Sequence, residues 1–406
     1  MPFRIALSGL NAAQTDLSIT GNNIANASTT GFKRSRAEFA DVYAVAFEGI
    51  SDIATGNGVS VAAVSQNFTQ GNIDFTERNL DIAVRGQGMF VLNDSSGQSF
   101  TRAGAFHVDR DGYVVNQAAQ KLQIFPAVTG GTFNTGVLTD LQLSTSDGPP
   151  QATSSITASL NLSSSEAPPV TVPFDPLDAT SFNSSTSTVI YDSLGTSHTS
   201  TMYYVKTAVD NQWDVYQYID GNVVPSGGAS PITMTFNSDG SINGPLTINY
   251  DAVPSGTGAD PIQVTLDYTN TTQYGSPFAV NGLAQNGFTT GRLSGIDIDS
   301  EGVVFARFTN GQATPLGKIA LANFPNVQGL RQLGDTNWAQ TYESGDLLLG
   351  EANTASFGLV QSGALETSNV DIAASLVNLI TAQRNYQANA QVISAADTIT
   401  QTIINI

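Results

Sequence analysis

The chain of 406 residues contains no cysteine, which excludes a disulfide framework and any chemistry that depends on a thiolate. Its two histidines, His107 and His198, lie in segments that we expect to belong to different domains. Neither has the neighbouring ligands or carboxylates that a metal site or a catalytic triad requires. We therefore predict no catalytic residue, no metal and no cofactor, and we expect that the protein is not an enzyme.

Charge is scarce, and positive charge is the scarcer sign. Charged residues make up 12% of the chain, with 15 Lys and Arg against 34 Asp and Glu, and the formal net charge is −19. A nucleic-acid partner needs a basic face, so this class of partner is excluded. The acidic residues lie mostly between two nearly neutral ends, and residues 148–284 contain Lys206 as their one basic residue. This distribution favours ends that associate and a middle that stays soluble.

Long apolar runs are also missing. No stretch of 18 apolar residues occurs, so the sequence predicts no membrane insertion. The first residues, "MPFRIALSGLNAAQ", lack the apolar core and the small-residue cleavage site of a secretory signal peptide.

Two glycine-containing patterns fall short of known ligand motifs. "VRGQGMF" (84–90) lacks the third glycine and the following helix of a dinucleotide-binding loop. An EF-hand loop needs a glutamate six residues after its glycine, but Ala118 and Phe308 occupy those positions. We predict that Asp109–Gly112 and Asp299–Gly302 are two related hairpin turns, because Asp and Gly favour the backbone angles of such turns.

Both ends of the chain carry residues at the 4,3 spacing of one face of an amphipathic helix. The spacing predicts one helix over residues 1–26 and a second that starts near the candidate N-cap Ser368 and runs to the end of the chain. The N-terminal stripe is Phe3, Leu7, Leu10, Gln14, Leu17, Gly21 and Ile24, and the C-terminal stripe is Ile372, Leu376, Leu379, Gln383, Tyr386, Ala390, Ile393, Ala396 and Ile399, continuing to Ile406.

The remaining face of the C-terminal helix is polar but almost uncharged, with residues such as Asn385, Asn389 and Gln391. A helix of this length exposes more apolar surface than a shorter partner helix covers. The pattern therefore favours packing among copies of the chain or the lining of a tube. The alternative is a two-helix stalk within one molecule.

Between these ends the pattern changes to period two with frequent turns, which indicates strands and hairpins. Residues 71–147 and 285–356 read as one β-domain that is split in sequence, and 148–284 as a β-domain inserted into it. We therefore predict a mainly β, nested multi-domain chain whose terminal helices form a coiled-coil-like pair.

The stretch "GNNIANASTTGFK" (21–33) ends the first predicted helix. Asn22, Asn23 and Asn26 are expected in left-handed or capping conformations, and Gly31 at positive φ. The following residues, 27–70, together with 357–368, are interpreted as a linker that orders against neighbouring molecules.

Several long motifs resemble the bacterial flagellar rod and hook family. At the N-terminus the resemblance lies in "ALSGLNAAQTDLSITGNNIANASTTGFKRSRAEFADVY", which contains the turn Asn22, Asn23, Asn26, Thr30, Gly31 and Phe32. At the C-terminus it lies in "SNVDIAASLVNLITAQRNYQANAQVISAADTITQTIINI". "RNLDIAVRGQGMFVL" and "FTRAGAFHVDRDGYVVN" resemble the β-domain blocks of the same family. The rod members are shorter, so the length of this chain favours a subunit of the hook.

This resemblance implies that the chain leaves the cytoplasm through the flagellar type III export apparatus and polymerises into a curved hollow tube. Such a tube acts as a universal joint between the rod and the filament. The implied partners are copies of the same chain, the distal rod, the hook cap and the hook–filament junction proteins. The helices would form the inner tube and 148–284 the outermost layer, and Phe39 and Tyr43 would belong to an export segment. A distal-rod or junction protein, or a secreted β-rich adhesin, remains as an alternative.

Overall fold

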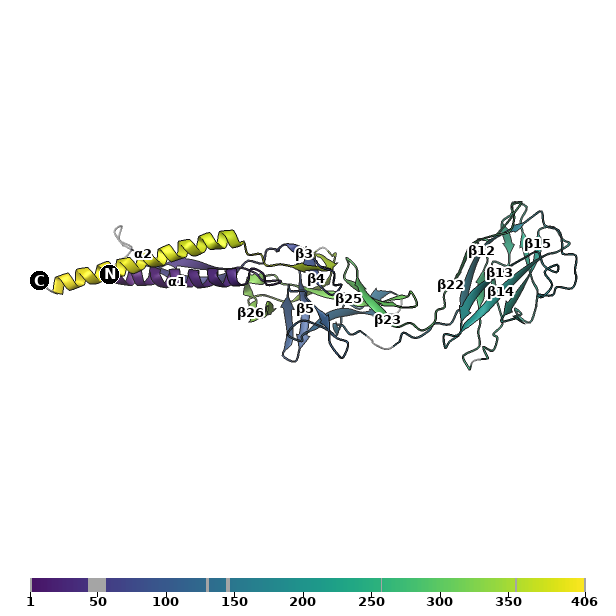
Figure 1. Cartoon of the computed structure of the whole chain (residues 1–406), viewed down its shortest axis with the longest axis horizontal. Coiled ribbons are helices and arrows are strands. Elements are labelled where there is room, and N and C mark those ends of the chain that lie inside the picture. Colours follow the sequence, from purple (N-terminus) through teal and green to yellow (C-terminus); the bar gives the residue numbers. More distant parts are fainter. Residues whose placement is uncertain are drawn as a thin grey trace. The chain divides into compact units, whose positions relative to one another are not determined.

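The computed structural model describes residues 2–42, 56–128, 131–143, 147–256, 258–354 and 356–404. The chain divides into two compact units. Unit 1 comprises Met1–Ser144, Gly295–Arg307 and Ala313–Ile406, and unit 2 comprises Thr145–Ser294 and Phe308–Gln312. Strands predominate, with long helices near both ends of the chain (Figure 1), which confirms the predicted mainly β fold class with terminal helices.

Unit 1 contains both helices and most of its strands in one large sheet. The helices are α1 (Pro2–Ala25) and α2 (Ile372–Ile404). The strands of its first part are β1 (Ser35–Asp41), β2 (Val59–Gln66), β3 (Ile73–Phe75), β4 (Ile82–Arg85), β5 (Met89–Asp94), β6 (Gly97–Thr101), β7 (His107–Val108), β8 (Val114–Val115), β9 (Lys121–Val128), β10 (Thr132–Phe133) and β11 (Thr139–Asp140). Those of its second part are β23 (Leu293–Ile298), β24 (Val303–Phe308), β25 (Ala313–Asn323), β26 (Arg331–Gly334), β27 (Asn337–Ala339), β28 (Leu348–Glu351), β29 (Leu359–Ser362) and β30 (Ala364–Glu366), with a 3₁₀ turn at Val327–Gly329.

The two parts of unit 1 interleave in space although unit 2 separates them in sequence. The main path of the sheet runs β23-β24-β25-β9-β5-β6-β27-β26, so β25 pairs with β9 and β5, which precede unit 2. Two small antiparallel pairs, β4 with β29 and β3 with β30, join the same two parts. The core beneath the large sheet is aromatic, with Phe100 in edge-to-face contact with Phe324 and Trp338 buried beside them.

Unit 2 is built from strands throughout its described part. They are β12 (Ser155–Ser163), β13 (Ser184–Tyr191), β14 (Ser197–Lys206), β15 (Gln212–Ile219), β16 (Asn222–Val223), β17 (Ile232–Phe236), β18 (Ile242–Gly244), β19 (Thr247–Asn249), β20 (Thr265–Asp267), β21 (Thr272–Tyr274) and β22 (Ala279–Gln285). They form two sheets, one around β12 and one in the order β13-β14-β15-β17-β18.

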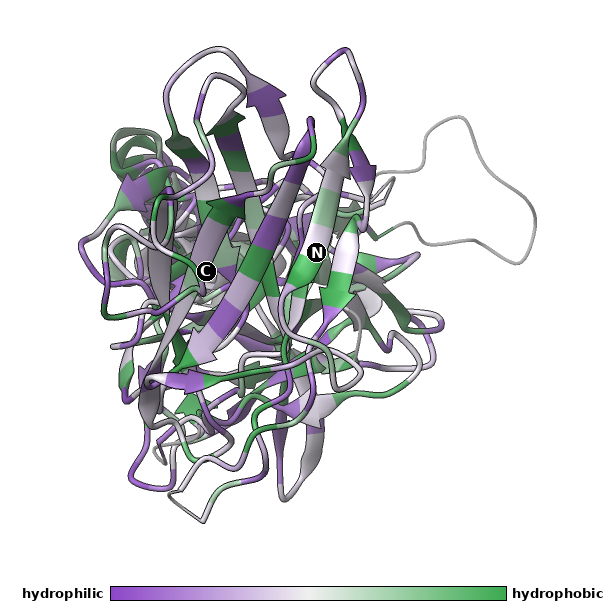
Figure 2. Ribbon diagram, turned by 90° about the vertical axis from the view of Figure 1, so that its right-hand side faces the viewer, coloured by the Kyte–Doolittle hydropathy of each residue, from purple (hydrophilic) through white to green (hydrophobic). Residues whose placement is uncertain are grey.

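The two sheets of unit 2 enclose one core. Buried and more exposed residues alternate strictly along β14 and β15, so the buried side chains, among them Tyr204 and Trp213, lie on one face. Figure 2, coloured by hydropathy, shows hydrophilic and hydrophobic segments along the strands. Because both sheets contribute to this core, unit 2 has the anatomy of a β-sandwich.

The predicted turns at Asp109–Gly112 and Asp299–Gly302 are confirmed and are nearly identical. Asp109 Oδ1 accepts hydrogen bonds from the amides of Asp111 and Tyr113, and Asp299 Oδ1 accepts them from Glu301 and Val303. Gly112 and Gly302 have φ values of 85° and 79°. In both turns one carboxylate oxygen is therefore committed to the backbone of its own turn.

The segment after α1 differs from the linker that the sequence suggested. β1 and β2 pair antiparallel along their whole length, from Ser35 opposite Gln66 to Asp41 opposite Val59. This hairpin contacts α1. The order of its described part thus arises within the chain, because backbone hydrogen bonds between the two strands replace the contacts expected from neighbours.

Candidate functional site

The terminal helices α1 and α2 lie side by side (Figure 1) and contact each other through small residues. Gly9 is in direct contact with Asn389: a Cβ atom at Gly9 would lie 2.6 Å from Asn389 Oδ1. The buried positions on the two helices are Ala6, Ala12, Ala13, Thr20, Asn23 and Ala382. Small side chains allow two helix backbones to approach closely, but they bury little apolar area.

The larger residues of the predicted stripes are divided between half-buried and exposed positions. Leu10, Leu17, Ile24, Leu379 and Ile393 are half-buried. Leu7, Ile372, Leu376, Tyr386 and Ile399 are exposed, with 41%, 52%, 45%, 39% and 61% of their surface accessible. Asn389, which the sequence placed on the polar face away from the stripe, lies in the seam. Half of these ten large stripe residues therefore stay exposed beside the chain's own helices.

The start of α2 differs from the prediction by one turn. Ser368 was the expected N-cap, but the helix begins at Ile372, and Asp371 Oδ1 accepts the hydrogen bond from the amide of Ala374. Asp371 is therefore the capping residue. Ser368 Oγ instead accepts a hydrogen bond from the amide of Val370.

The turn after α1 uses its asparagines through their side chains. Asn23 is buried and binds both backbone groups of Ser35, the carbonyl at 2.7 Å and the amide at 2.9 Å. Asn26 Nδ2 donates to the carbonyl and the side chain of Asn22. None of the three has positive φ, so of the two predicted alternatives, left-handed or capping, the structure shows capping. Amide side chains can cap a helix end without that conformation because they carry a donor and an acceptor.

Gly31 has the predicted positive φ, at 70°. A Cβ atom at Gly31 would lie 2.5 Å from the backbone nitrogen of Ala103, so a side chain is excluded by space as well as by backbone angle. Phe32 is buried, and Thr30 lies in the turn between them and α1. The glycine thus brings the chain directly onto the β-strand region of unit 1.

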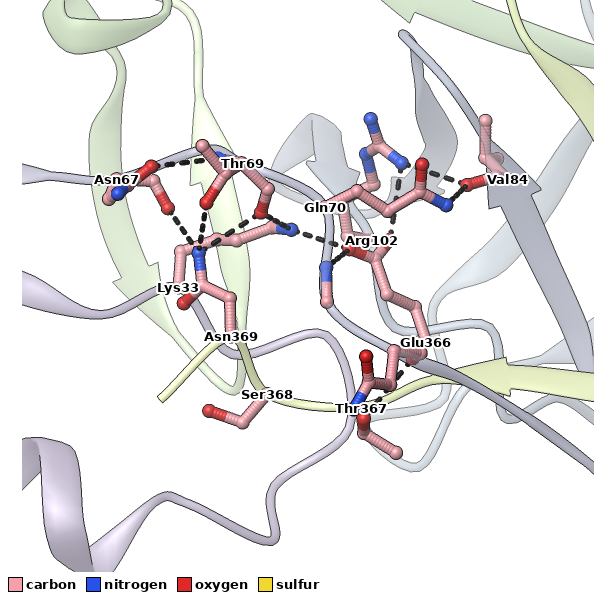
Figure 3. Close-up of polar contacts among 12 residues, drawn as sticks. Lys33, Asn67, Thr69, Gln70, Val84, Arg102, Glu366, Thr367, Ser368 and Asn369 are labelled. Carbon is pink, nitrogen blue, oxygen red and sulfur yellow. Dashed lines mark hydrogen bonds and ion pairs between the residues drawn. The ribbon is translucent and has the colours of Figure 1, made fainter. Parts of the chain in front are cut away.

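Lys33, the next residue, belongs to a buried ion cluster (Figure 3). Its ammonium lies 2.6 Å from Glu366 Oε1 and 2.9 Å from the carbonyl oxygen of Thr69. Arg102 Nη1 lies 3.1 Å from Glu366 Oε2, and the amide of Gly71 donates to Oε1. The side chains of Lys33 and Glu366 are fully buried, and that of Arg102 is 8% exposed.

Asn369 completes the contacts between the segments on either side of the helices. Its Oδ1 accepts a hydrogen bond from the amide of Arg34, and its Nδ2 donates to the carbonyls of Asn67 and Thr69. The amide of Gly31 donates to the backbone oxygen of Glu366. We call the residues 31–34, 67–72, 84–86, 102 and 364–369 the junction. It connects α1, α2 and the large sheet within unit 1.

Electrostatics at the junction are unbalanced toward positive charge. Burial lowers the pKa of Lys33, and the neighbouring Glu366 opposes this effect. Burial also lowers the pKa of Arg102, again opposed by Glu366. Two cations thus depend on one carboxylate for their charge to be tolerated in the interior.

Sequence reasoning did not find this cluster. It counted Lys33 and Arg34 as charges at a nearly neutral end and assigned no role to Arg102, Glu366 or Asn369. The available signal was the isolation of Glu366 within "SGALETSN", since a lone charge amid small and apolar residues is often buried with a partner.

The remaining predicted site residues lie on or beyond the hairpin. Phe39 is on β1 and 44% of its surface is exposed. Tyr43 lies outside the described residues. The hairpin is tied to α1 at both ends, by the contacts of Asn23 with Ser35 and by the amide of Val59, which donates to Ser8 Oγ at 3.2 Å.

Within the described ranges, no group of three or more His, Asp or Glu side chains has an arrangement suited to a metal ion. Neither α1 nor α2 is long and apolar enough to cross a membrane.

Four family models match successive parts of the chain. The model described as "Flagella basal body rod protein" matches residues 3–33, and "Flagellar basal body rod FlgEFG protein C-terminal" matches residues 361–406. "Flagellar hook protein FlgE/F/G D1 domain" matches residues 83–183, and "Flagellar basal body protein FlaE D2 domain" matches residues 159–288.

Two relatives that match the whole chain carry the same name. The flagellar hook protein FlgE of Escherichia coli K12 is 39% identical over 411 residues, and that of Salmonella typhimurium LT2 is 38% identical over 421, with all of both chains covered in each case. The crystal structure of Helicobacter pylori flagellar hook protein FlgE2 matches with a TM-score of 0.54 at 16% identity, over 72% of this chain and 100% of the other. This structural match shows a shared fold.

Proposed function

The chain belongs to the family of bacterial flagellar hook proteins, and on that premise we propose that it assembles with copies of itself into a curved hollow tube that serves as a universal joint between rod and filament. As a member of this family it is a structural component of the flagellum, located in the hook and basal body.

The observation that carries the proposal is the uncovered apolar stripe. Ile372 and Leu376 stay about half exposed although α1 lies along α2, and Ile399 is 61% exposed. An exposed row of large apolar residues on a long helix is a surface for protein contacts. Contacts of one surface with a different surface on the next copy do not close on themselves, and they generate a helical tube.

We assign the layers of the tube from the predicted domains. Residues 1–26 and 369–406 form the inner wall, with 27–70 and 357–368 around it. Residues 71–147 and 285–356 form the middle layer, and 148–284 the outer one. The outer layer is strongly acidic, so neighbouring copies repel and slide past one another when the tube bends.

The specific partners are inferred from the ends of the chain. The rod-protein models match residues 3–33 and 361–406, and a helix pair shared with rod subunits supports end-to-end stacking on the distal rod. We propose the hook cap, the hook–filament junction proteins and the export apparatus as further partners, with Phe39 and Tyr43 in the export segment. Relatives that match the whole chain are named hook proteins, which favours the hook over a rod or adhesin assignment. We expect no catalytic activity.

The experiment replaces two exposed stripe residues in the full chain, Ile372→Ser with Leu376→Ser. The monomer should keep its helix content, because these side chains are half exposed. Each loses about 1 kcal/mol of contact with a neighbour, given about 1.5–3 kcal/mol for full burial of such a side chain. The pair should therefore raise the concentration at which tubes form by roughly 30-fold.

The matched control is Leu194→Ser with Val209→Ser in unit 2, where 60% and 59% of the surface is exposed. Tube formation is measured by sedimentation and electron microscopy under precipitating salt. The control should polymerise like the unmodified chain. Equal polymerisation by the Ile372 and Leu376 variant, or equal inhibition by the control, contradicts the assignment of the stripe as the assembly surface.

A further inference from the structure

The junction buries two cations, Lys33 and Arg102, with one anion, Glu366. Lys33 follows α1, Arg102 lies beyond β6 in the sheet region, and Glu366 ends β30 before α2. The three therefore come from the three parts of unit 1 that must be held together. Their distances to the carboxylate are 2.6 Å for Lys33 and 3.1 Å for Arg102.

Without Glu366, the remaining site disfavours the positive charge of Lys33. Arg102 disfavours a second positive charge beside it, and the neutral groups left are backbone carbonyls such as that of Thr69. Burying a charge with no counter-ion is strongly unfavourable, and removal of one partner of a buried pair commonly costs two to three orders of magnitude in the folding equilibrium. Without that carboxylate, the charge of Lys33 therefore opposes the burial of segment 31–34.

We propose that Glu366 is the positioning residue that allows the charged side chain of Lys33 to be buried in the junction. As a consequence, α1 is fixed on the sheet only after the segment before α2 is in place. One carboxylate then sets the attachment of both helices. Two neighbouring hydrogen bonds hold the same segments together. Asn369 Oδ1 accepts a hydrogen bond from the amide of Arg34, and the backbone oxygen of Glu366 accepts one from the amide of Gly31. Closure of the junction is a property of the single chain, so it is tested without any tube.

The first test is Glu366→Gln in the full-length monomer, followed by hydrogen–deuterium exchange. The amides of Gly31 and Arg34 report closure, since both donate to the segment 364–369 in the closed junction. We expect their exchange to accelerate at least 100-fold, while the strands of unit 2 keep their protection. Unchanged exchange at these two amides overturns the proposal.

The matched control is Glu351→Gln. Glu351 lies 2.6 Å from Lys318, which is nearly buried, but Lys318 also lies 3.9 Å from Glu301. There, one cation has two carboxylates, so the loss of one leaves the charge compensated. This variant should leave exchange at Gly31 and Arg34 unchanged, and an opening as large as that of Glu366→Gln would show that the effect is general destabilisation.

A double-mutant cycle with Lys33→Met distinguishes compensation of the Lys33 charge from ordinary packing as the role of Glu366. Alone, Lys33→Met leaves Arg102 and Glu366 as a balanced pair, so protection should change by less than tenfold. Combined with Glu366→Gln, the same substitution removes the uncompensated ammonium and leaves Arg102, which also donates to the carbonyls of Val84 and Gly86. Protection should therefore recover at least tenfold relative to Glu366→Gln alone. If Lys33→Met instead deepens the loss, Glu366 serves as a packing or hydrogen-bonding group and the proposal is wrong.

Discussion

The seam between α1 and α2 makes a sharp prediction, because two glycines of the same helix occupy opposite environments. A Cβ atom added at Gly9 would lie 2.6 Å from Asn389 Oδ1 and 2.9 Å from its Cγ, whereas at Gly21 it would meet nothing within 4 Å. Replacing glycine by alanine inside a helix is normally worth about 1 kcal/mol through helix propensity. Gly21→Ala should therefore stabilise α1 by about that amount.

Gly9→Ala should gain nothing. The new methyl group forces the side chain of Asn389 to rotate, which breaks the hydrogen bond of its Nδ2 to the carbonyl of Asn385 at 2.9 Å. The loss of that bond costs about 1 kcal/mol and offsets the propensity gain. We expect Gly9→Ala to lie about 1–2 kcal/mol below Gly21→Ala in free energy of unfolding of the helices. In an Asn389→Ala background, Gly9→Ala should recover the gain of about 1 kcal/mol, because the obstructing side chain is gone.

The assay is thermal melting of dilute monomer followed by circular dichroism at 222 nm. In the described part of the chain the α-helices are α1 and α2, so this signal reports them. Equal stabilisation by Gly9→Ala and Gly21→Ala would refute the seam. It would also remove the reason for assigning the outward face to Leu376 and its neighbours.

Two further substitutions test local features. Gly31→Ala should open the junction and lower its stability by more than about 2 kcal/mol, because φ of Gly31 is 70° and the backbone of Ala103 leaves no room for a Cβ atom. Hydrogen exchange of the Gly71 amide measures this opening. In unit 2, burial by itself lowers the pKa of His198. Hydrogen bonds to Asp220 at 2.6 Å and to Asp192 at 3.4 Å have the opposite and larger effect, so the pKa of His198 is raised. The paired imidazolium therefore stabilises unit 2 fully below about pH 6.5, and this stability is lost as the pH rises through the raised pKa of His198. Each tenfold increase in proton affinity on folding is worth about 1.4 kcal/mol. Thermal unfolding of unit 2 between pH 5 and 9 should show this fall, and His198→Asn should flatten it; a fall of equal size in the variant would assign it to other groups.

Features governed by local physics were accessible from the sequence. The apolar spacing located α1 to within two residues, and the turns at Asp109–Gly112 and Asp299–Gly302 follow from what aspartate and glycine do within four residues of chain. Gly31 was placed correctly because a helix end followed by glycine has few backbone solutions. In each case the residues that decide the structure are neighbours in sequence.

Features that depend on distant segments were not accessible. The stripe of Leu7 and Leu376 has the spacing of a paired seam, but periodicity does not say which partner covers it, and the chain pairs its helices through Ala6, Gly9 and Ala382. Lys33 and Glu366 are separated by 333 positions, so their pairing requires the fold of the whole of unit 1. The same limit applies to the hairpin β1–β2, whose attachment depends on Asn23 reaching Ser35.

The seam and the junction solve different parts of one mechanical problem. A helix pair held by alanine and glycine gains little from its own burial, so it stays available to neighbours through the residues that it leaves outside. Such a weakly held pair would be poorly oriented unless its base were fixed. A buried ion cluster suits that purpose, since charged hydrogen bonds are directional while apolar contacts are tolerant of sliding. We therefore propose that Lys33, Arg102 and Glu366 set the direction in which the helices leave the β-domain, and that the outward leucines bind neighbouring copies.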